Sequence, residues 1–368
     1  MKLCFFGAYD PDYPRNAIIR KGLRSNGMEV SECWLAPKYK FWLRYPILFF
    51  RSRRFHGMDD FFFVPEFCQK DVPLARILSF LATNKVIFDP LASRYETKIM
   101  DWKRNPPNSW QAWWNFKIDY WSFKLSDLVL ADTRVHKEYY CQKYDLPSGK
   151  VEVLPVGFDS DLFKHNLRKA SGEEKKHFIV LFFGSFLPLH GIETIVSSAK
   201  IILREDASIK FRLVGSGQTL PKAQALVSNL GLNNVRFESW VPQSILPLNI
   251  ASADICLGIF GKSEKTKRVV PHKIFQAMAM KKPVITLRTP AVEELFSHRK
   301  HIFFCPSPNP SNLARAILEL KKDSFLREEI GERGYRLVSQ NFSQKAIGRM
   351  LIDILERNFG PSSGRAVN

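Results

Sequence analysis

The stretch from Lys262 to Leu295, KSEKTKRVVPHKIFQAMAMKKPVITLRTPAVEEL, predicts a basic loop, a short helix and a buried strand in succession. Pro271 suits the first position of a helix, because that position needs no backbone N–H and has a φ close to that of proline. The helix HKIFQAMAM therefore directs the positive end of its dipole toward the residues before Pro271. Four cations surround this end: Lys265, Lys267, Arg268 and Lys273. The stretch predicts an anion site, with phosphate as the expected ligand. A solvated basic loop before an ordinary helix is the alternative.

The composition is that of a globular protein long enough for two domains. Of the 368 residues, 45% are hydrophobic and 25% are charged, and single domains usually have about 100–200 residues. The apolar runs are far shorter than the roughly 20 residues of a membrane-spanning helix. The N-terminal MKLCFFGAYDPDY indicates a strand and a turn rather than a signal peptide. Scattered cysteines without paired spacing indicate reduced thiols, a cytoplasmic protein, and neither a disulfide framework nor a metal site.

Short apolar strands alternate with helices along most of the chain. The pattern begins with KLCFFG and starts afresh with FIVLFFG, after a polar stretch rich in Lys and Glu. Such strands are typical of parallel sheets that are buried on both faces. The predicted fold class is therefore α/β, with two doubly wound, Rossmann-like parallel sheets facing a central cleft. The expected domains comprise residues 1–165 and 166–342, and a last helix at 343–360 is expected to pack back on the first domain.

Residues that follow the strands are candidate site residues, because ligands of such sheets bind at the carboxyl ends of the strands. Four glycines lie at strand exits: Gly7, Gly184, Gly215 and Gly217. Each is compatible with a tight turn or with close approach of a ligand. Arg15 opens the helix after the first of these exits. Asp89 ends the strand KVIFD, where a carboxylate binds a sugar hydroxyl, acts as a base or forms a simple Asp-Pro turn.

Four segments in a fixed order carry a more specific signal. They are FFGSFLPLHGIETIV, FRLVGSG, VRFESWVPQSILPLNIASADICL, and PHKIFQAMAMKKPVIT followed by TPAVEEL. In order and spacing they resemble GT-B fold glycosyltransferases of the retaining family four (group 1) type, and GAYDPDYPRNAIIRKGLRSNGMEV fits that family's first strand and helix. The resemblance implies an N-terminal acceptor-side domain and a C-terminal domain that binds a nucleotide-diphosphate sugar.

The chain departs from that family's usual residues at four positions. The family usually places an arginine and a lysine on the donor diphosphate, where this chain has Ser185 and His190. It also has two glutamates, for the donor sugar and the ribose, where this chain has Arg268 and Gln276. Because cations of the basic loop and helix start replace the two that are missing, we expect the diphosphate to be held from the opposite loop and the helix end. Gln276 can still hydrogen-bond a ribose hydroxyl.

The resemblance also implies roles for individual residues. The nucleotide base is expected near Val241 and Pro242. The full set of expected donor-binding residues is Gly7, Arg15, Gly184, Ser185, His190, Gly215, Gly217, Val241, Pro242, Lys267, Pro271 and Gln276. The expected catalytic residues are Asp89 near the anomeric centre, with Arg268 and Lys273 stabilising the leaving diphosphate. We expect a UDP- or GDP-linked sugar as substrate, no cofactor and no metal ion.

The N-terminal half is unusually basic and aromatic. The net charge is +19, and seven of the eight tryptophans precede residue 125. The segment KYKFWLRYPILFFRSRRF alone has six cations and seven aromatic residues, and WKRNPPNSWQAWWNFKIDYWSFK is similar. Such segments suit an anionic membrane surface, an aromatic core with cationic edges or, less well, nucleic acid. The expected membrane or acceptor patch consists of Lys40, Trp42, Arg44, Arg51, Arg53 and Arg54.

These observations lead to one functional hypothesis and one alternative. We expect a glycosyltransferase that acts with retention on a membrane- or lipid-linked glycan acceptor, in polysaccharide biosynthesis at the cytoplasmic face of the membrane. The alternative is a non-catalytic basic module that binds a sugar nucleotide or nucleic acid.

Overall fold

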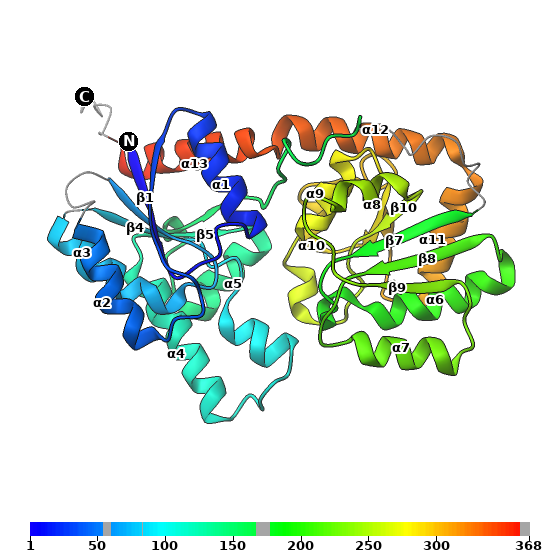
Figure 1. The fold of residues 1–368 in the computed structure, drawn as a ribbon, viewed down its shortest axis with the longest axis horizontal. Coiled ribbons are helices and arrows are strands. Elements are labelled where there is room, and N and C mark those ends of the chain that lie inside the picture. The colour runs from blue at the N-terminus through cyan, green and yellow to red at the C-terminus, as the bar shows by residue number, and fades with distance from the viewer. Residues whose placement is uncertain (54–59, 83, 167–176, 361–368) are drawn as a thin grey trace. The chain divides into compact units, whose positions relative to one another are not determined.

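The chain forms two compact units in the computed structural model, which describes residues 1–53, 60–82, 84–166 and 177–360 (Figure 1). Unit 1 comprises Met1–Tyr95, Trp110–Gly157 and Phe342–Asn368. Unit 2 comprises Glu96–Ser109 and Phe158–Asn341. The segment Glu96–Ser109 thus packs with unit 2 although the residues on both sides of it belong to unit 1.

Unit 1 contains a six-stranded sheet with the strand order β2-β1-β3-β4-β5-β6, in which every pair is parallel. Its strands are β1 (Lys2–Gly7), β2 (Glu29–Trp34), β3 (Phe61–Val64), β4 (Lys85–Phe88), β5 (Leu128–Ala131) and β6 (Val151–Val153). Its α-helices are α1 (Pro14–Ser25), α2 (Phe41–Ser52), α3 (Val72–Ala82), α4 (Trp110–Leu125), α5 (Arg134–Tyr144) and α13 (Gln344–Phe359). The core of this sheet is aromatic, with Phe5, Phe6, Phe62 and Phe63 fully buried.

The last helix, α13, packs against α1, although the two are far apart in the sequence (Figure 1, red and blue). Two glycines allow the backbones to touch. A Cβ on Gly22 would lie 2.1 Å from the carbonyl oxygen of Gln344, and a Cβ on Gly348 would lie 2.1 Å from the carbonyl carbon of Gly22. Any larger residue at either position would force the helices apart.

Unit 2 contains a second six-stranded parallel sheet, with the order β12-β11-β10-β7-β8-β9. Its strands are β7 (Phe178–Phe183), β8 (Ile209–Val214), β9 (Val235–Glu238), β10 (Ile255–Leu257), β11 (Val284–Leu287) and β12 (Phe303–Cys305). Its α-helices are α6 (Ile192–Glu205), α7 (Leu220–Asn229), α8 (Leu246–Ser252), α9 (His272–Ala279), α10 (Pro290–Glu293), α11 (Pro310–Lys322) and α12 (Ser324–Asn341). Two parallel sheets with flanking helices confirm the predicted doubly wound α/β class.

The short helix after the basic loop begins one residue later than the sequence predicts. Pro271 has an extended backbone, with φ −73° and ψ 152°, and it is the residue that precedes α9. His272 is the first helical residue, so the prediction that Pro271 occupies the first helical position is wrong by one position. The N–H groups of the first turn still point toward the loop at 262–271, as helix geometry requires.

Candidate functional site

The exits of three neighbouring strands in unit 2 form one continuous set of loops. Gly184, after β7, donates its N–H to the carbonyl of Val214 at 3.0 Å, and Phe186 donates to Ser216 at 2.7 Å. On the other side, the N–H of Phe260 after β10 donates to the carbonyl of His190 at 3.0 Å. These bonds hold the β7 loop between the β10 and β8 loops. This edge of the sheet is where doubly wound folds bind ligands.

Internal packing explains two of the four glycines at the strand exits. Gly7, Gly184, Gly215 and Gly217 have φ values between 125° and 145°, a backbone that side chains rarely allow. A Cβ on Gly215 would lie 2.0 Å from the carbonyl oxygen of Gly184, and one on Gly217 would lie 2.7 Å from the N of Phe186. The turn interpretation is therefore sufficient for these two positions. Gly184 differs, because a Cβ there would meet the Nζ of Lys273 at 3.2 Å.

Lys273 is the most unusual cation of unit 2. It lies in the first turn of α9, its residue is 6% exposed, and its Nζ has no hydrogen-bond partner among the described residues. The Nζ lies 3.8 Å from the centroid of the Phe182 ring. Burial holds the pKa of this amine well below its usual range. A buried amine at the N-terminal end of a helix, beside a glycine loop, is poised to receive an anion.

His190 does not supply the charge of the lysine that the related family usually has at this position. Its Nδ1 is hydrogen-bonded to the carbonyl oxygen of Ser185, so this nitrogen carries the proton. Burial, together with the nearby Lys273, holds the pKa of His190 well below its usual range. His190 is thus a neutral residue that ties the two ends of the β7 loop together, and Lys273 lies beside that loop at Gly184.

The other cations of the basic loop are paired within unit 2. Arg268 Nη1 donates to Glu96 Oε1 at 2.5 Å. Lys265 Nζ donates to the hydroxyl of Thr97 at 2.8 Å. Lys267 forms an exposed ion pair with Glu264. Lys265 and Arg268, two of the four cations expected around the helix end, thus have partners from a segment that lies about 170 residues earlier. Their roles toward a donor stay predictions.

The sequence prediction missed these partners. Glu96 and Thr97 belong to a single turn of π-helix, Glu96–Asp101, which packs against the turn Glu264–Lys267. Asp101 in the same turn is also buried, and burial raises the pKa of its carboxyl above its usual range. The only signal in the sequence was two acidic residues in an otherwise basic and aromatic stretch, ETKIMDWKR. Nothing local indicates that they pack with unit 2.

The remaining donor-binding candidates lie along the same edge of unit 2. Gln276 is buried one turn into α9. Val241 and Pro242 follow the end of β9, the strand next to β8. The structure therefore places them in one unit with Gly184, Ser185 and Lys273. Their roles toward a donor stay predictions.

The candidates in unit 1 form an ion pair with each other. Arg15 Nε donates to Asp89 Oδ2 at 2.8 Å, and Nη2 donates to Oδ1 at 3.0 Å. Its Nη1 donates to the carbonyl of Pro155 at 2.8 Å. Both side chains are buried. A bidentate pair of this kind ties β4 to α1 and stabilises unit 1. The catalytic role expected for Asp89 and the donor contact expected for Arg15 and Gly7 stay predictions.

The expected membrane patch is only partly a surface of free cations. Arg44 is largely buried and donates to the carboxylate of Asp71 at 3.1 Å, so its place in that patch is wrong. Lys40 lies over the ring of Trp42, and Arg53 lies over the rings of two phenylalanines. Arg51 donates to the carbonyl of Trp34. Arg54 lies outside the described residues.

The tryptophans of α4 are exposed. Trp110, Trp113, Trp114 and Trp121 have exposed fractions between 46% and 66%. The interpretation of this segment as an aromatic core is therefore wrong for them, although Phe123 on the same helix is fully buried. None of the helices in the described part of the chain is both long and apolar enough to cross a membrane.

Comparisons with known proteins agree with this architecture. Residues 163–337 match the family described as glycosyl transferases group 1. The chain is 23% identical over 214 residues to the putative colanic acid biosynthesis glycosyltransferase WcaL of Salmonella typhimurium, covering 57% of this chain and 52% of that protein. It is 21% identical to the amylovoran biosynthesis glycosyltransferase AmsK of Erwinia amylovora, covering 64% and 57%. The matches thus span little more than half the length of these relatives.

Solved structures are similar over nearly the whole chain. Anabaena HepE, in complex with UDP and glucose, has a TM-score of 0.70 at 16% identity, covering 96% of this chain and 99% of that one. Sucrose-phosphate synthase from Thermosynechococcus elongatus has a TM-score of 0.76 at 16% identity, covering 98% and 99%. The predicted resemblance is confirmed: the chain matches the group 1 glycosyl transferases over residues 163–337, and it has the fold of GT-B glycosyltransferases.

Proposed function

We propose that this chain is a glycosyltransferase of polysaccharide biosynthesis, which transfers a sugar from a nucleotide-diphosphate donor to a lipid-linked glycan acceptor with retention. The observation that carries the proposal is Lys273. A buried amine without a hydrogen-bond partner in the described residues is unfavourable in the unliganded protein, and a bound anion would remove that penalty. The donor diphosphate is the anion that a transferase of this fold brings to the strand exits of unit 2.

In the proposed complex the diphosphate lies between the Gly184 loop and the N-terminal end of α9. Lys273 donates to a phosphate oxygen, and the free N–H groups of the helix add further donors. Because these groups supply positive charge where the leaving group gains negative charge, we propose that the reaction needs neither a metal ion nor a cofactor. A UDP- or GDP-linked sugar fits this site, and HepE, which has the same fold, was solved with UDP and glucose.

The proposed reaction forms one bond and breaks one. The acceptor hydroxyl oxygen attacks the anomeric carbon on the face that the diphosphate leaves, so the configuration is retained. The bond between that carbon and the diphosphate oxygen breaks, and its electron pair remains on the diphosphate. The hydroxyl proton moves to the departing diphosphate, which requires strong stabilisation of the phosphate more than a protein base. The names of WcaL and AmsK, both polysaccharide biosynthesis enzymes, support this setting, and we propose that the protein acts at the cytoplasmic face of the membrane.

Two measurements test the proposal. Calorimetric titration with UDP-, GDP-, ADP- and CMP-sugars should give micromolar to millimolar binding for one nucleotide class. Incubation with that donor should then release nucleotide, slowly by hydrolysis and faster with an acceptor. Binding without any release of nucleotide would favour the non-catalytic alternative. Four residues that differ from those usual in the related family are the reason for that alternative: Ser185, His190, Arg268 and Gln276. No binding of any sugar nucleotide would contradict both.

A further inference from the structure

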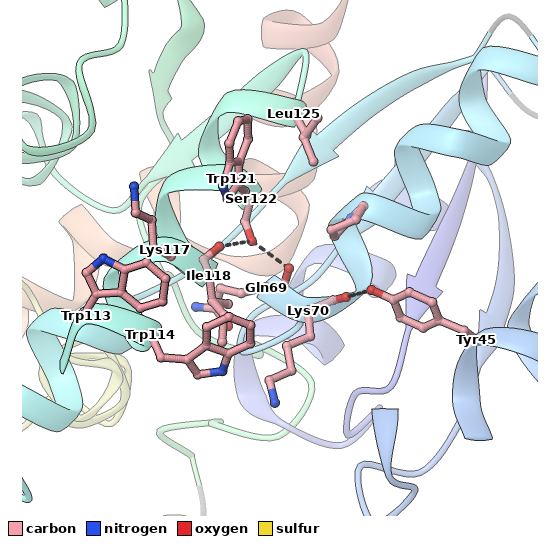
Figure 2. Close-up of a pocket in the computed structure, with 11 residues that line it drawn as sticks. Tyr45, Gln69, Lys70, Trp113, Trp114, Lys117, Ile118, Trp121, Ser122 and Leu125 are labelled. Carbon is pink, nitrogen blue, oxygen red and sulfur yellow. Dashed lines mark hydrogen bonds between the residues drawn. The ribbon is translucent and has the colours of Figure 1, made fainter. Parts of the chain in front are cut away.

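Unit 1 contains a pocket that the proposed donor site in unit 2 does not use (Figure 2). Its volume is about 660 Å³, within the roughly 300–1,000 Å³ typical of ligand pockets. One wall is a face of α4, and the opposite wall comes from the start of α3, the turn before it and Tyr45 of α2. All of these elements belong to unit 1.

The wall formed by α4 is apolar because of the spacing of its residues. Trp114, Ile118, Trp121 and Leu125 recur at intervals of three or four, which places them on one face of a helix. Two of them, Trp114 and Trp121, are about half exposed. A large apolar face that the protein leaves in solvent indicates a binding surface.

The uncharged donor groups of Ser122, Tyr45 and Gln69 in the pocket are used within the protein. Ser122 donates to the carbonyl of Gln69 at 2.6 Å, and the hydroxyl of Tyr45 donates to the carbonyl of Lys70 (Figure 2). The amide nitrogen of Gln69 donates to the carbonyl of Ala92 at 3.0 Å. Because these donors are used within the protein, a glycan would find apolar rings where its hydroxyl groups need partners. The pocket therefore favours a hydrocarbon.

Two cations line the same pocket. Lys117 projects from α4, with its Nζ 5.8 Å from the ring centroid of Trp113. Lys70 lies on the opposite wall, and burial together with Arg94 and Arg44 lowers its pKa. The site thus combines an apolar interior with positive charge from both walls, which complements a ligand with a hydrocarbon body and an anionic group.

The surface beside the pocket is also apolar. Ile77, Phe80 and Leu81 of α3 are exposed, Phe80 to 83%. Helix α3 packs against both α4 and α2, and its Pro73 lines the pocket. Exposed aliphatic and aromatic side chains with nearby lysines are typical of proteins that contact a bilayer interface. A ligand held in a membrane could reach the pocket from this side.

We propose that this pocket binds the hydrocarbon chain of a single-chain lipid phosphate, and that Lys117 binds its phosphate. The inference rests on the proposed function for the role of that lipid, which is the carrier of the acceptor glycan. A volume suited to one ligand of moderate size favours one chain over the two chains of a phospholipid.

The test is calorimetric titration of the full chain with geranylgeranyl phosphate, below the concentration at which the probe aggregates. We expect the exposed double variant Trp114→Ala/Trp121→Ala to bind at least about tenfold more weakly, since each ring contributes buried apolar area. Phe325→Ala is the control, because Phe325 is 72% exposed and belongs to unit 2, so its ring does not line the pocket. It should change the affinity less than twofold. Lys117→Gln should weaken the binding of geranylgeranyl phosphate more than the binding of the alcohol geranylgeraniol.

Three outcomes would overturn the inference. One is equal weakening by Phe325→Ala, which would indicate adsorption on any exposed ring. Another is tighter binding of a two-chain phosphatidic acid or of single-stranded nucleic acid. The third is that inorganic phosphate at the same concentration competes fully with the lipid. UDP-sugar binding is measured on the same samples, so a failure of the pocket and a failure of the donor site are distinguished.

Discussion

The two sheets of this protein differ in whether the buried cations at their strand exits have partners. In unit 1 the two largely buried arginines there are paired with carboxylates, Arg15 with Asp89 and Arg44 with Asp71. A third carboxyl, that of Glu66 after β3, accepts a hydrogen bond from Asn16, and burial raises its pKa well above the usual range. In unit 2 the corresponding edge holds a neutral histidine and a buried lysine whose amine has no hydrogen-bond partner among the described residues. A buried amine is costly to leave without a partner, so the exception at Lys273 needs a reason. We take that reason to be a ligand of unit 2.

Removing one partner of the Arg15–Asp89 pair should have the largest effect. Asp89→Asn leaves the buried guanidinium of Arg15 without its counter-charge, which costs about 3–5 kcal/mol of stability. Chemical denaturation measures this loss. The double variant Arg15→Met/Asp89→Leu should lose less than the single one, because no buried charge remains. Normal stability of Asp89→Asn with lost sugar transfer would instead indicate that Asp89 acts in catalysis.

In unit 2, Lys273→Met removes a buried group instead of leaving one without its partner. It removes a buried amine, so the unliganded protein should melt at a higher temperature. Sugar-nucleotide affinity should fall roughly 10- to 150-fold, the equivalent of a hydrogen bond between charged groups at about 1.5–3 kcal/mol. Thermal melts and calorimetry report the two effects on one sample. Lys267→Met, at an exposed ion pair, serves as the control and should change either quantity little. Unchanged donor binding by Lys273→Met would refute the site.

A charge swap tests whether unit 2 needs the Arg268–Glu96 pair. Arg268→Glu alone restores the residue that the related family usually has, but it places two carboxylates together, and donor affinity should fall about tenfold. Adding Glu96→Arg should recover most of the loss. Calorimetry with the same donor measures both variants. If the single variant binds as well as the unmodified protein, the pair has no role in shaping the basic loop.

The smallest expected effect is on pH dependence. The pKa of Lys273 is lowered by burial in the unliganded protein, and a bound diphosphate raises it again. Binding therefore takes up a proton wherever the free amine is neutral, and donor affinity should decrease as the pH rises through the lowered pKa. Titrations in buffers of different ionisation enthalpy detect this proton. The Lys273→Met variant should lack the proton uptake, and an identical pH profile in that variant would contradict the assignment.

The fold was predictable because its signals are local. Runs such as FIVLFFG and FRLVGSG each indicate a buried parallel strand that ends at a glycine, and two sets of them imply two sheets. The position of α9 was predictable to within one residue from Pro271. These signals depend only on neighbours in the sequence.

Which cations are paired or buried was not predictable from the sequence, because this depends on residues far away in the chain. Arg268 and Lys265 are paired by Glu96 and Thr97, about 170 positions earlier. Arg44 is paired by Asp71, and Arg15 by Asp89. Lys273 of α9 likewise lies against the ring of Phe182 in β7, a residue that is far from it in the sequence. A basic sequence thus indicates how many cations exist, whereas the tertiary structure decides which of them remain available.

The contact between α1 and α13 sets an order of events during synthesis. Unit 1 begins with the first strand, yet its glycine-mediated contact requires α13, which the ribosome makes after every element of unit 2. Unit 2 has all of its segments once α12 has emerged. Unit 1, whose sheet is made first, is therefore completed last, and until then the surface of α1 that α13 covers stays open to chaperones or to aggregation.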